Sequence, residues 1–392
     1  MTQKQSKAQN AQSKQLTAKE VHALTGQVMQ EHFQLDMDKS RYQASDIWDV
    51  LVAAAVQCIT VEAACNLLED APSPNTVRNT VNALLADEAQ LAQLEATVNH
   101  LLQARLPKGL LKRSRVCAVD FTDIPYHGQH EEDDDHIRRG RDKSGTTHFH
   151  SYATLCVVQH NRRYTVAITL FRRSDKALEA LKRVLNSASE AGLGVRRLLL
   201  DREFDNNAIV AYLAQQPFPT IMPVMVRGRG GVRNVIRGRK SHTTPYTRAS
   251  KLYGDQVLPI TIVCRYKKGR FGDYGIQHFA YVTIGQLKMA PHQIAAEYRR
   301  RFGIETSYRL MNTMRIRTTA TSATLRLFYV ALALLLLNLW CYVKWSHLFI
   351  PKRGPRQVLH HLLPLARWRF WLWEVVKLRQ GFSLSISVPL SA

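Results

Sequence analysis

Three acidic side chains stand where carboxylates could bind metal ions. Asp120 ends the apolar run RVCAVD, Asp201 ends a second apolar run in LLLDREF, and Glu305 lies within YRRRFGIETSYR. Clustered carboxylates repel one another unless a cation lies between them, and Mg²⁺ prefers such oxygen ligands. Two divalent ions about 3.5–4 Å apart can activate an attacking oxygen and stabilise a leaving oxygen at phosphorus. The three residues therefore suggest cleavage or transfer of a phosphodiester.

The elements around the two aspartates are predicted to be strands. Short runs rich in β-branched residues predict strands at 116–121, 151–159, 164–171, 195–204 and 219–227, and amphipathic runs predict helices at 174–192 and 206–216. This order is typical of an α/β layered domain with a mixed sheet. The first and fourth strands of such a sheet can be neighbours, which would bring Asp120 and Asp201 to one edge. A helix packed across that edge would add Glu305.

Asp123 follows Asp120 by three residues and precedes Ile-Pro. A turn is expected there, and a short carboxylate commonly bonds nearby backbone amides in a turn. We therefore predict that Asp120, at the end of its strand, is the metal ligand and that Asp123 is a turn residue.

The charge of the chain is uneven. Residues 1–110 hold 9 Lys+Arg and 12 Asp+Glu, a net of −3, so the remaining 45 and 19 give residues 111–392 a net of +26. Such a field attracts polyanions, because phosphates release counterions on binding. Nucleic acid is favoured as the partner over an anionic lipid surface.

Helices are predicted on both sides of the strand-rich region. Residues 60–85 fit a helix-turn-helix whose second helix carries Arg78 and Asn79, or equally an ordinary helical hairpin. Residues 227–285 lack the helical pattern and predict a β-rich insertion with six basic residues at 227–240. The apolar segment 325–343 is nearly long enough to span a bilayer, for which about 20 residues are needed. We favour a helix buried in a large domain, which is also apolar all round.

Several motifs together resemble the DDE transposases of prokaryotic insertion sequences, which have an RNase H-like catalytic domain. The resemblance is to the branch with a Y-x2-R-x3-E signature, matched here by Tyr298, Arg301 and Glu305, and with a β-rich insertion before the glutamate. The first motif, D-x-T, matches Asp120-Phe121-Thr122, and the second begins at Asp201. The resemblance covers about residues 111–345. One departure is Asn312, where the family often has lysine, so Arg309 or Arg315 is expected to take the basic role.

The resemblance implies roles for these residues. Asp120, Asp201 and Glu305 would hold two Mg²⁺ ions, for which Mn²⁺ can substitute, and would nick the element end and then activate the freed 3′-hydroxyl for strand transfer. In this branch the hydroxyl can attack the opposite strand to form a hairpin. Tyr298 and Arg301 would grip phosphates near the scissile bond. The implied partners are double-stranded DNA, as terminal inverted repeats and target, and a second copy of the chain in a homodimer that pairs two ends.

Histidines and other acidic residues give weaker signals. HEEDDDH at 130–136 could bind a metal, but a solvated loop is favoured. His148 and His150 alternate on a strand, where structural histidines are commoner than ligands. Glu203 and Asp205 are expected to shape the surroundings of Asp201 or to cap the next helix, not to bind metal.

The predicted fold is an RNase H-like mixed-sheet catalytic domain with a β-rich insertion, preceded by an all-α N-terminal domain. The expected divisions are a tail (1–15), a helical domain (16–110), the first catalytic part (111–226), the insertion (227–285), the second catalytic part (286–350) and a helical tail (351–392). Six cysteines without a CxxC pair and a polar start without a signal peptide predict a protein of the reducing cytoplasm. The resemblance to prokaryotic transposases implies that it is nucleoid-associated.

Three alternatives to a transposase remain. A metal-dependent nuclease would share the site but not transfer strands. A domesticated relative would bind DNA without cutting it. A membrane protein would use 325–343 as a span, whereas the transposase reading predicts no membrane association.

Overall fold

The computed structural model describes residues 15–38, 40–85, 91–129, 134–159, 162–226, 231–269, 275–350, 354 and 356–383. The predicted tail (1–15) lies almost wholly outside this part of the chain. Residues 130–133 of the acidic loop and residues 227–230 of the basic stretch also lie outside it.

Helices come first along the chain, before any strand. They are α1 (Ala18–His32), α2 (Ala44–Gln57), α3 (Val61–Leu67), α4 (Pro74–Leu84), α5 (Leu91–Gln103) and the short α6 (Lys108–Leu111). Side-chain caps begin several of them: Thr17 accepts a hydrogen bond from the Glu20 amide, and Ser73 accepts one from the Thr76 amide. The predicted helical N-terminal region is therefore present, with α3 and α4 as the helix pair that carries Arg78 and Asn79.

A mixed sheet of nine strands forms the centre of the molecule. The strands are β1 (Arg115–Pro125), β2 (Arg138–Lys143), β3 (Thr146–Gln159), β4 (Arg162–Leu170), β5 (Val195–Leu200), β6 (Thr220–Pro223), β7 (His242–Arg248), β8 (Gln256–Tyr266) and β9 (Ile276–Ile284). Their order is β2-β3-β1-β5-β6-β9-β8-β7, and β4 pairs with β3 on the edge that β2 also uses. Strands β1, β5 and β6 are parallel, and the other pairings are antiparallel.

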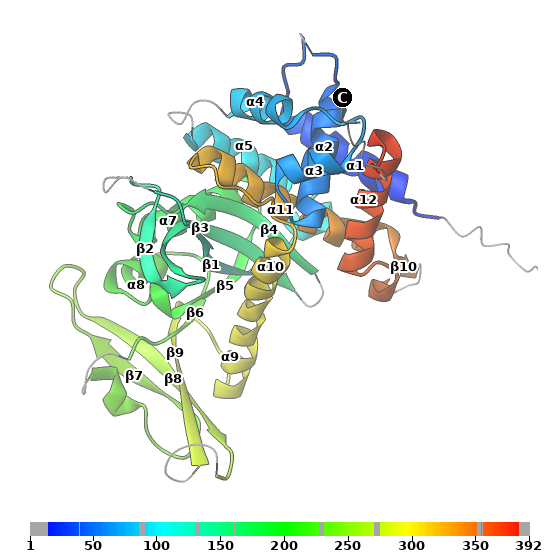
Figure 1. Ribbon diagram of the computed structural model, residues 1–392. Helices are drawn as coiled ribbons and strands as arrows, with labels where there is room; N and C mark the ends of the chain where they lie inside the picture. Colours follow the sequence, from blue (N-terminus) through cyan, green and yellow to red (C-terminus); the bar gives the residue numbers. More distant parts are fainter. Residues whose placement is uncertain are drawn as a thin grey trace, which may run out of the picture.

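Helices cover both faces of the sheet around β1 and β5. On one face lie α7 (Ala177–Glu190) and α8 (Asn207–Ala214), and on the other lie α9 (Pro291–Tyr298), the 3-10 turn η5 (Arg299–Arg301) and α10 (Phe302–Asn312). Residues 116–120 of β1 are buried on both faces, whereas burial alternates from Phe121 onwards, where this double cover ends. Strands β7–β9 extend the sheet on the side of the molecule away from the N-terminal helices (Figure 1).

Helix α11 (Ala323–His347) lies in the core. It is the one helix in the described residues long and apolar enough by itself to cross a membrane, with mean hydropathy 1.8, but 89% of that window is buried inside the protein. Its apolar side chains pack with those of α1, α2, α4, α5 and β4. The side chain of Asn338 accepts a hydrogen bond from the Thr165 amide and donates to the carbonyls of Thr165 and Leu102. The side-chain amide of Asn338, which lies inside the apolar segment, is therefore hydrogen-bonded to the edge strand β4 and to α5.

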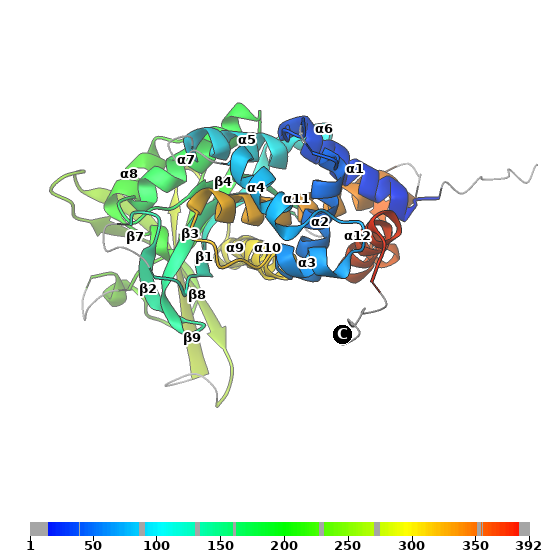
Figure 2. The same cartoon turned by 45° about the horizontal axis from the view of Figure 1, so that its top comes forward.

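The C-terminal part packs beside the N-terminal helices. It contains the short strands β10 (Phe349–Ile350) and β11 (Gln357–Val358), the turn η6 (His360–Leu362), and α12 (Leu365–Gln380). In both views α12 lies beside α1 and α2, on the opposite side of the molecule from β7–β9 (Figures 1 and 2). The predicted fold class, a mixed-sheet α/β protein with a β-rich addition and an all-α N-terminal region, is confirmed.

Candidate active site

Asp120 and Asp201 meet at the carboxyl edge of the parallel pair β1–β5. The last pair in that ladder is Val119 with Leu200, so each aspartate is the next residue on its strand. The prediction that Asp120 ends its strand is wrong, because β1 continues to Pro125 through antiparallel pairing with the longer β3. Asp120 nevertheless lies where β5 stops, which gives its side chain the expected place at an edge.

The alternation of side chains explains why both aspartates point to the same face. Val116 and Ala118 of β1 and Leu199 of β5 pack in the cluster formed with α9 and α10. Two residues further along each strand, Asp120 and Asp201 therefore face the same helices. The sequence-based expectation that a helix across this edge carries the third carboxylate matches the position of α10, which carries Glu305.

Arg301 lies among the three carboxylates. Its Nη1 donates to Asp120 Oδ2 at 2.8 Å, its Nη2 donates to Glu305 Oε1 at 2.6 Å, and the same Nη2 lies 3.5 Å from Asp201 Oδ1. Its Nε donates to the Tyr298 hydroxyl at 2.8 Å. The arginine is only 5% exposed. The guanidinium of Arg301 thus contacts the carboxylates of Asp120, Asp201 and Glu305, the three residues that the sequence motifs indicate.

Burial and neighbouring charges act on the ionisation of this cluster. Burial, together with the negative charges of Asp201 and Glu305, raises the pKa of Asp120 to about 7 against the attraction of Arg301. The nearby tyrosine and carboxylates keep the pKa of Arg301 above its ordinary value despite burial. Three carboxylates and one guanidinium leave an excess of negative charge, so the cluster favours additional cations or protons.

Tyr308, which the sequence analysis did not single out, ties α10 to β1 and β3. Its hydroxyl donates to the backbone carbonyl of Asp120 at 2.9 Å and lies 2.7 Å from Thr154 Oγ1 of β3. Tyr308 is buried in the cluster beneath the site. Its place three residues after Glu305, on the same side of the helix, is the signal that could have found it.

Asp123 is not in a turn, so that prediction is wrong. It lies in β1 opposite Ser151, whose Oγ donates to Asp123 Oδ1 at 2.6 Å. It follows Asp120 by three positions, an odd offset, so it projects from the opposite face of the sheet. The pairing with β3 overrides the turn preference of Asp-Ile-Pro, and the two aspartates are separated by strand geometry.

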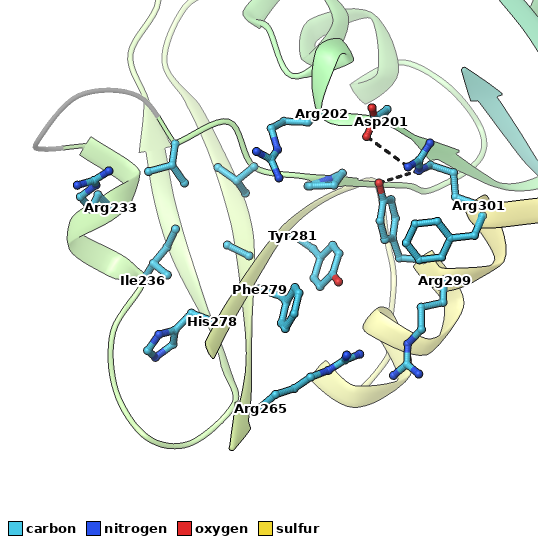
Figure 3. Close-up of a pocket in the computed structure, with 16 residues that line it drawn as sticks. Asp201, Arg202, Arg233, Ile236, Arg265, His278, Phe279, Tyr281, Arg299 and Arg301 are labelled. Atoms are coloured by element: carbon cyan, nitrogen blue, oxygen red, sulfur yellow. Dashed lines mark hydrogen bonds and ion pairs between the residues drawn. The ribbon is translucent and has the colours of Figure 1, made fainter. Parts of the chain in front are cut away.

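A cleft of about 550 Å³ opens beside Asp201 on the face that carries α9 (Figure 3). Phe279 and Tyr281 of β9 and Tyr298 of α9 give it aromatic walls. Its cationic groups come from four elements or their flanks, namely Arg202, Arg233, Arg265, Arg299 and Arg301. Aromatic faces beside guanidinium groups form a surface suited to an unpaired nucleic acid strand.

The β-rich region beside this cleft is anchored to the segment after Asp201 through β7, which pairs with β8. Arg248 of β7 forms an ion pair of 2.5 Å with Asp205, whose side chain is fully buried and also accepts a hydrogen bond from the Met225 amide. Of the two roles expected for Asp205, capping the next helix belongs instead to Asn206, which accepts from the Ile209 amide. Asp205 thus positions the β-rich region relative to Asp201.

The family of the chain follows from its sequence profile. Residues 111–340 match the family described as "Transposase DDE domain". The chain belongs to this family. It is a DDE transposase, an enzyme that cleaves and joins DNA.

Comparison with solved structures agrees with this fold. The transposase is similar to the piggyBac transposase in a synaptic complex with hairpin DNA, with a TM-score of 0.54 and 12% sequence identity, over 92% of this chain and 76% of that chain. At that identity the likeness concerns the fold alone. No curated protein sequence matches the transposase.

The other predicted DNA-contacting residues differ in exposure. Arg78 and Asn79 are exposed on α4, and Arg309 is exposed on α10 one turn beyond Glu305. Arg315 is half-buried after α10, and its Nε is buried without a hydrogen-bond partner among the described residues. Arg309 is therefore better placed than Arg315 to supply the positive charge that Asn312 lacks.

The carboxylates of the transposase suit divalent metal ions in donor type. Enzymes of this family use such ions, and Asp120, Asp201 and Glu305 supply hard oxygen donors that all reach one cationic group. Among the described residues no group of three His, Cys, Asp or Glu side chains forms a closed metal-ligand set. Arg301 lies between the carboxylates instead and contacts one oxygen of each of them.

His150 is a buried structural residue of β3, as favoured from the sequence. It is fully buried against the ring of Tyr126, and neither ring nitrogen has a hydrogen-bond partner among the described residues. Burial lowers its pKa to about 3, helped by the positive charge of Arg326. The folded transposase therefore holds this imidazole neutral.

The stability of the transposase should decline in acid because of His150. Its folded-state pKa of about 3 lies below the ordinary value of about 6.5. Between these values the unfolded chain binds the extra proton, so the free energy of unfolding falls as pH drops, by up to about 1.4 kcal/mol per pH unit. Urea unfolding of His150→Phe from pH 6.5 to 4 should show a weaker pH dependence than wild type. The exposed His361→Phe serves as the control, and equal slopes for His150→Phe and wild type would contradict the prediction.

Proposed function

We propose that this transposase cuts the ends of a prokaryotic insertion sequence of the Y-x2-R-x3-E branch and transfers the freed strand to target DNA. The observation that carries the proposal is the convergence of Asp120, Asp201 and Glu305 on Arg301. Residues more than 180 positions apart in sequence reach one guanidinium only because β1, β5 and α10 meet at this edge.

The three carboxylates are the proposed ligands of two Mg²⁺ ions, with Mn²⁺ as a substitute. When bound, such ions supply Lewis-acid activation of the attacking oxygen and stabilise the leaving oxygen. Tyr308 holds the Asp120 backbone and thereby fixes the distance between β1 and α10. Arg301 keeps the carboxylates together before ions bind, and its guanidinium, once released from them, is available to a phosphate beside Tyr298.

The DNA itself is proposed to occupy two parts of the protein. The cleft beside Asp201 accepts the strand next to the scissile phosphate, because aromatic side chains stack on bases and arginines attract phosphates. The exposed Arg309 on α10, and Arg78 and Asn79 on α4, are proposed to contact the duplex of the terminal inverted repeat. A homodimer that pairs two ends, acting at the nucleoid in the cytoplasm, completes the proposal.

Cleavage of an element-end duplex with Mg²⁺ tests this function. Wild type should nick at the end and give joined strand-transfer products from a labelled end, whereas Asp201→Ala should give neither. If Asp201→Ala cut as well as wild type, the proposed site would be wrong. Nicking without any strand-transfer product would identify a nuclease instead.

A further inference from the structure

A second hollow opens beside Asp201, apart from the cleft of about 550 Å³ lined by residues of β8 and β9, which we call the insertion cleft. Its volume is about 700 Å³, and it shares Asp201 and Arg202 with that cleft. Its other walls come from β2, from side chains of β1 and β3, and from the segments after β5 and β6. Besides the β2 residues these are Phe121, Asp123, Phe149, Ser151, Glu203 and Met225. Phe121 and Asp123 project from the face opposite to Asp120. The two hollows therefore lie on the two faces of the sheet and meet at Asp201 and Arg202.

The wall formed by β2 is strongly basic. Its six residues, RRGRDK, contain four cations and one carboxylate. Arg139, Arg141 and Lys143 are exposed, and none of them is a member of an ion pair among the described residues. Arg138 differs from them, because it is half-buried and its guanidinium lies 3.7 Å from the centre of the Phe171 ring. Three cations thus face solvent along one side of the hollow.

An aromatic stack fixes this basic strand relative to the catalytic aspartates. The ring beneath Arg138, Phe171, stacks on Phe121 at 4.3 Å, and Phe121 stacks on Phe204 at 4.7 Å. Phe121 follows Asp120 directly, and Phe204 lies three residues after Asp201. At the middle of β2, Gly140 lies so close to Phe149 that an added Cβ would come within 3.1 Å of the ring. The three cations are consequently held at a set position beside Asp201.

We infer that β2 binds the DNA backbone on the side of the scissile phosphate opposite to the strand held in the insertion cleft. This inference rests on the proposed function, because it takes the scissile phosphate to lie at Asp201. A duplex carries one phosphate per about 1.7 Å of its axis, so DNA leaving the site past Arg202 presents several phosphates to Arg139, Arg141 and Lys143. Cations on an edge strand also discourage pairing between copies of a chain, but that role needs no hollow beside a catalytic residue.

Salt-dependent DNA binding tests the inference. The triple variant Arg139→Gln, Arg141→Gln and Lys143→Gln should bind a random-sequence 30-base-pair duplex about 10-fold or more weakly than wild type in 0.1 M NaCl with EDTA. The slope of log affinity against log salt should fall by about 2–3, since each phosphate contact contributes about 0.9. The matched control removes three exposed cations near the opposite end of β1, Lys108→Gln, Lys112→Gln and Arg113→Gln, and should change the slope by less than 1.

The failures of the two proposals are distinguishable. If wild type neither binds nor cuts element-end DNA, the proposed function fails. If wild type does both and the β2 triple behaves as the control triple does, only the inference about β2 is overturned. Thermal unfolding checks that each variant is folded. If the β2 triple variant does not fold, the single variant Arg141→Gln is measured in its place.

Backbone footprinting on an element-end duplex tests the sidedness. The β2 triple should lose protection on one side of the scissile phosphate, and Arg233→Gln with Arg265→Gln, in the insertion cleft, should lose it on the other side. Loss of protection on the same side in both variants would overturn the assignment of β2.

Discussion

Asp120→Asn should lower the rate of Mg²⁺-dependent cleavage of element-end DNA by about 10³-fold or more, a loss of about 4 kcal/mol of transition-state stabilisation. The substitution keeps the size of the side chain but removes the charge that a divalent ion needs. It also removes one of the three carboxylates that reach Arg301. Single-turnover cleavage of a labelled end measures the effect.

Asp123→Asn is the matched control for this prediction. Asp123 lies in the same strand but on the other face, where it accepts a hydrogen bond from Ser151. Its substitution should weaken that contact and lower thermal stability slightly, with cleavage within about 10-fold of wild type because the charge cluster is unchanged. Equal loss of metal-dependent cleavage in both variants, with both folded, would overturn the division of roles between the two aspartates.

Arg301→Gln should destabilise the metal-free protein by about 3 kcal/mol. The guanidinium is 5% exposed and reaches Asp120, Glu305 and Asp201. Removing the guanidinium leaves the buried carboxylate of Asp120 without a positive partner. The expected loss of stability is at the low end for buried ion pairs, because Asp201 and Glu305 are partly exposed. The unfolding temperature should fall by about 4 °C, because unfolding entropy is about 2 cal/mol/K per residue and the chain has 392 residues. Added Mg²⁺ should restore more of this loss in the variant than it adds to wild type, because the ion replaces the missing positive charge.

Arg300→Gln provides the comparison for Arg301→Gln. Its side chain is 48% exposed and pairs with Glu297 at 3.3 Å, so its removal should cost under about 1 kcal/mol and should not change the response to Mg²⁺. Calorimetry with and without MgCl₂ measures both variants. If Arg301→Gln unfolded at the same temperature as wild type in both conditions, the guanidinium would not be the counter-ion of the cluster.

The face of the sheet that bears Asp120 and Asp201 could be predicted largely from the sequence. Apolar runs that end in Asp120 and Asp201 imply strands that leave the core at one edge, and this edge forms in the structure. The extent of β1 could not be predicted, because it depends on pairing with residues of β3 that lie 24–40 positions away along the chain. The same long-range pairing overrode the turn preference of the Asp-Ile-Pro segment and placed Asp123 in a strand.

The partners of charged side chains were harder to predict than the elements. Helical spacing places Arg301 beside Glu305, but only the packing of α10 against β1 directs its guanidinium to Asp120 as well. Strand β2 carries no alternation of apolar residues, so RRGRDK gives no strand signal, and its pairing with β3 depends on the partner. The ion pair between Asp205 and Arg248 could not be predicted, because Arg248 lies 43 positions further along the chain. Local sequence alone suggested a helix cap as one role of Asp205.

The burial of α11 has a consequence for synthesis of the chain on the ribosome. The N-terminal helices share their apolar core with α11, which begins about 220 residues after α5 ends. At a translation rate of about 5–20 residues per second, α11 is synthesised about 10–45 s after the N-terminal helices that it covers. During that interval the nascent chain exposes apolar surface that chaperones recognise. The enzyme can complete its helical region only after the sheet that bears both aspartates has been made.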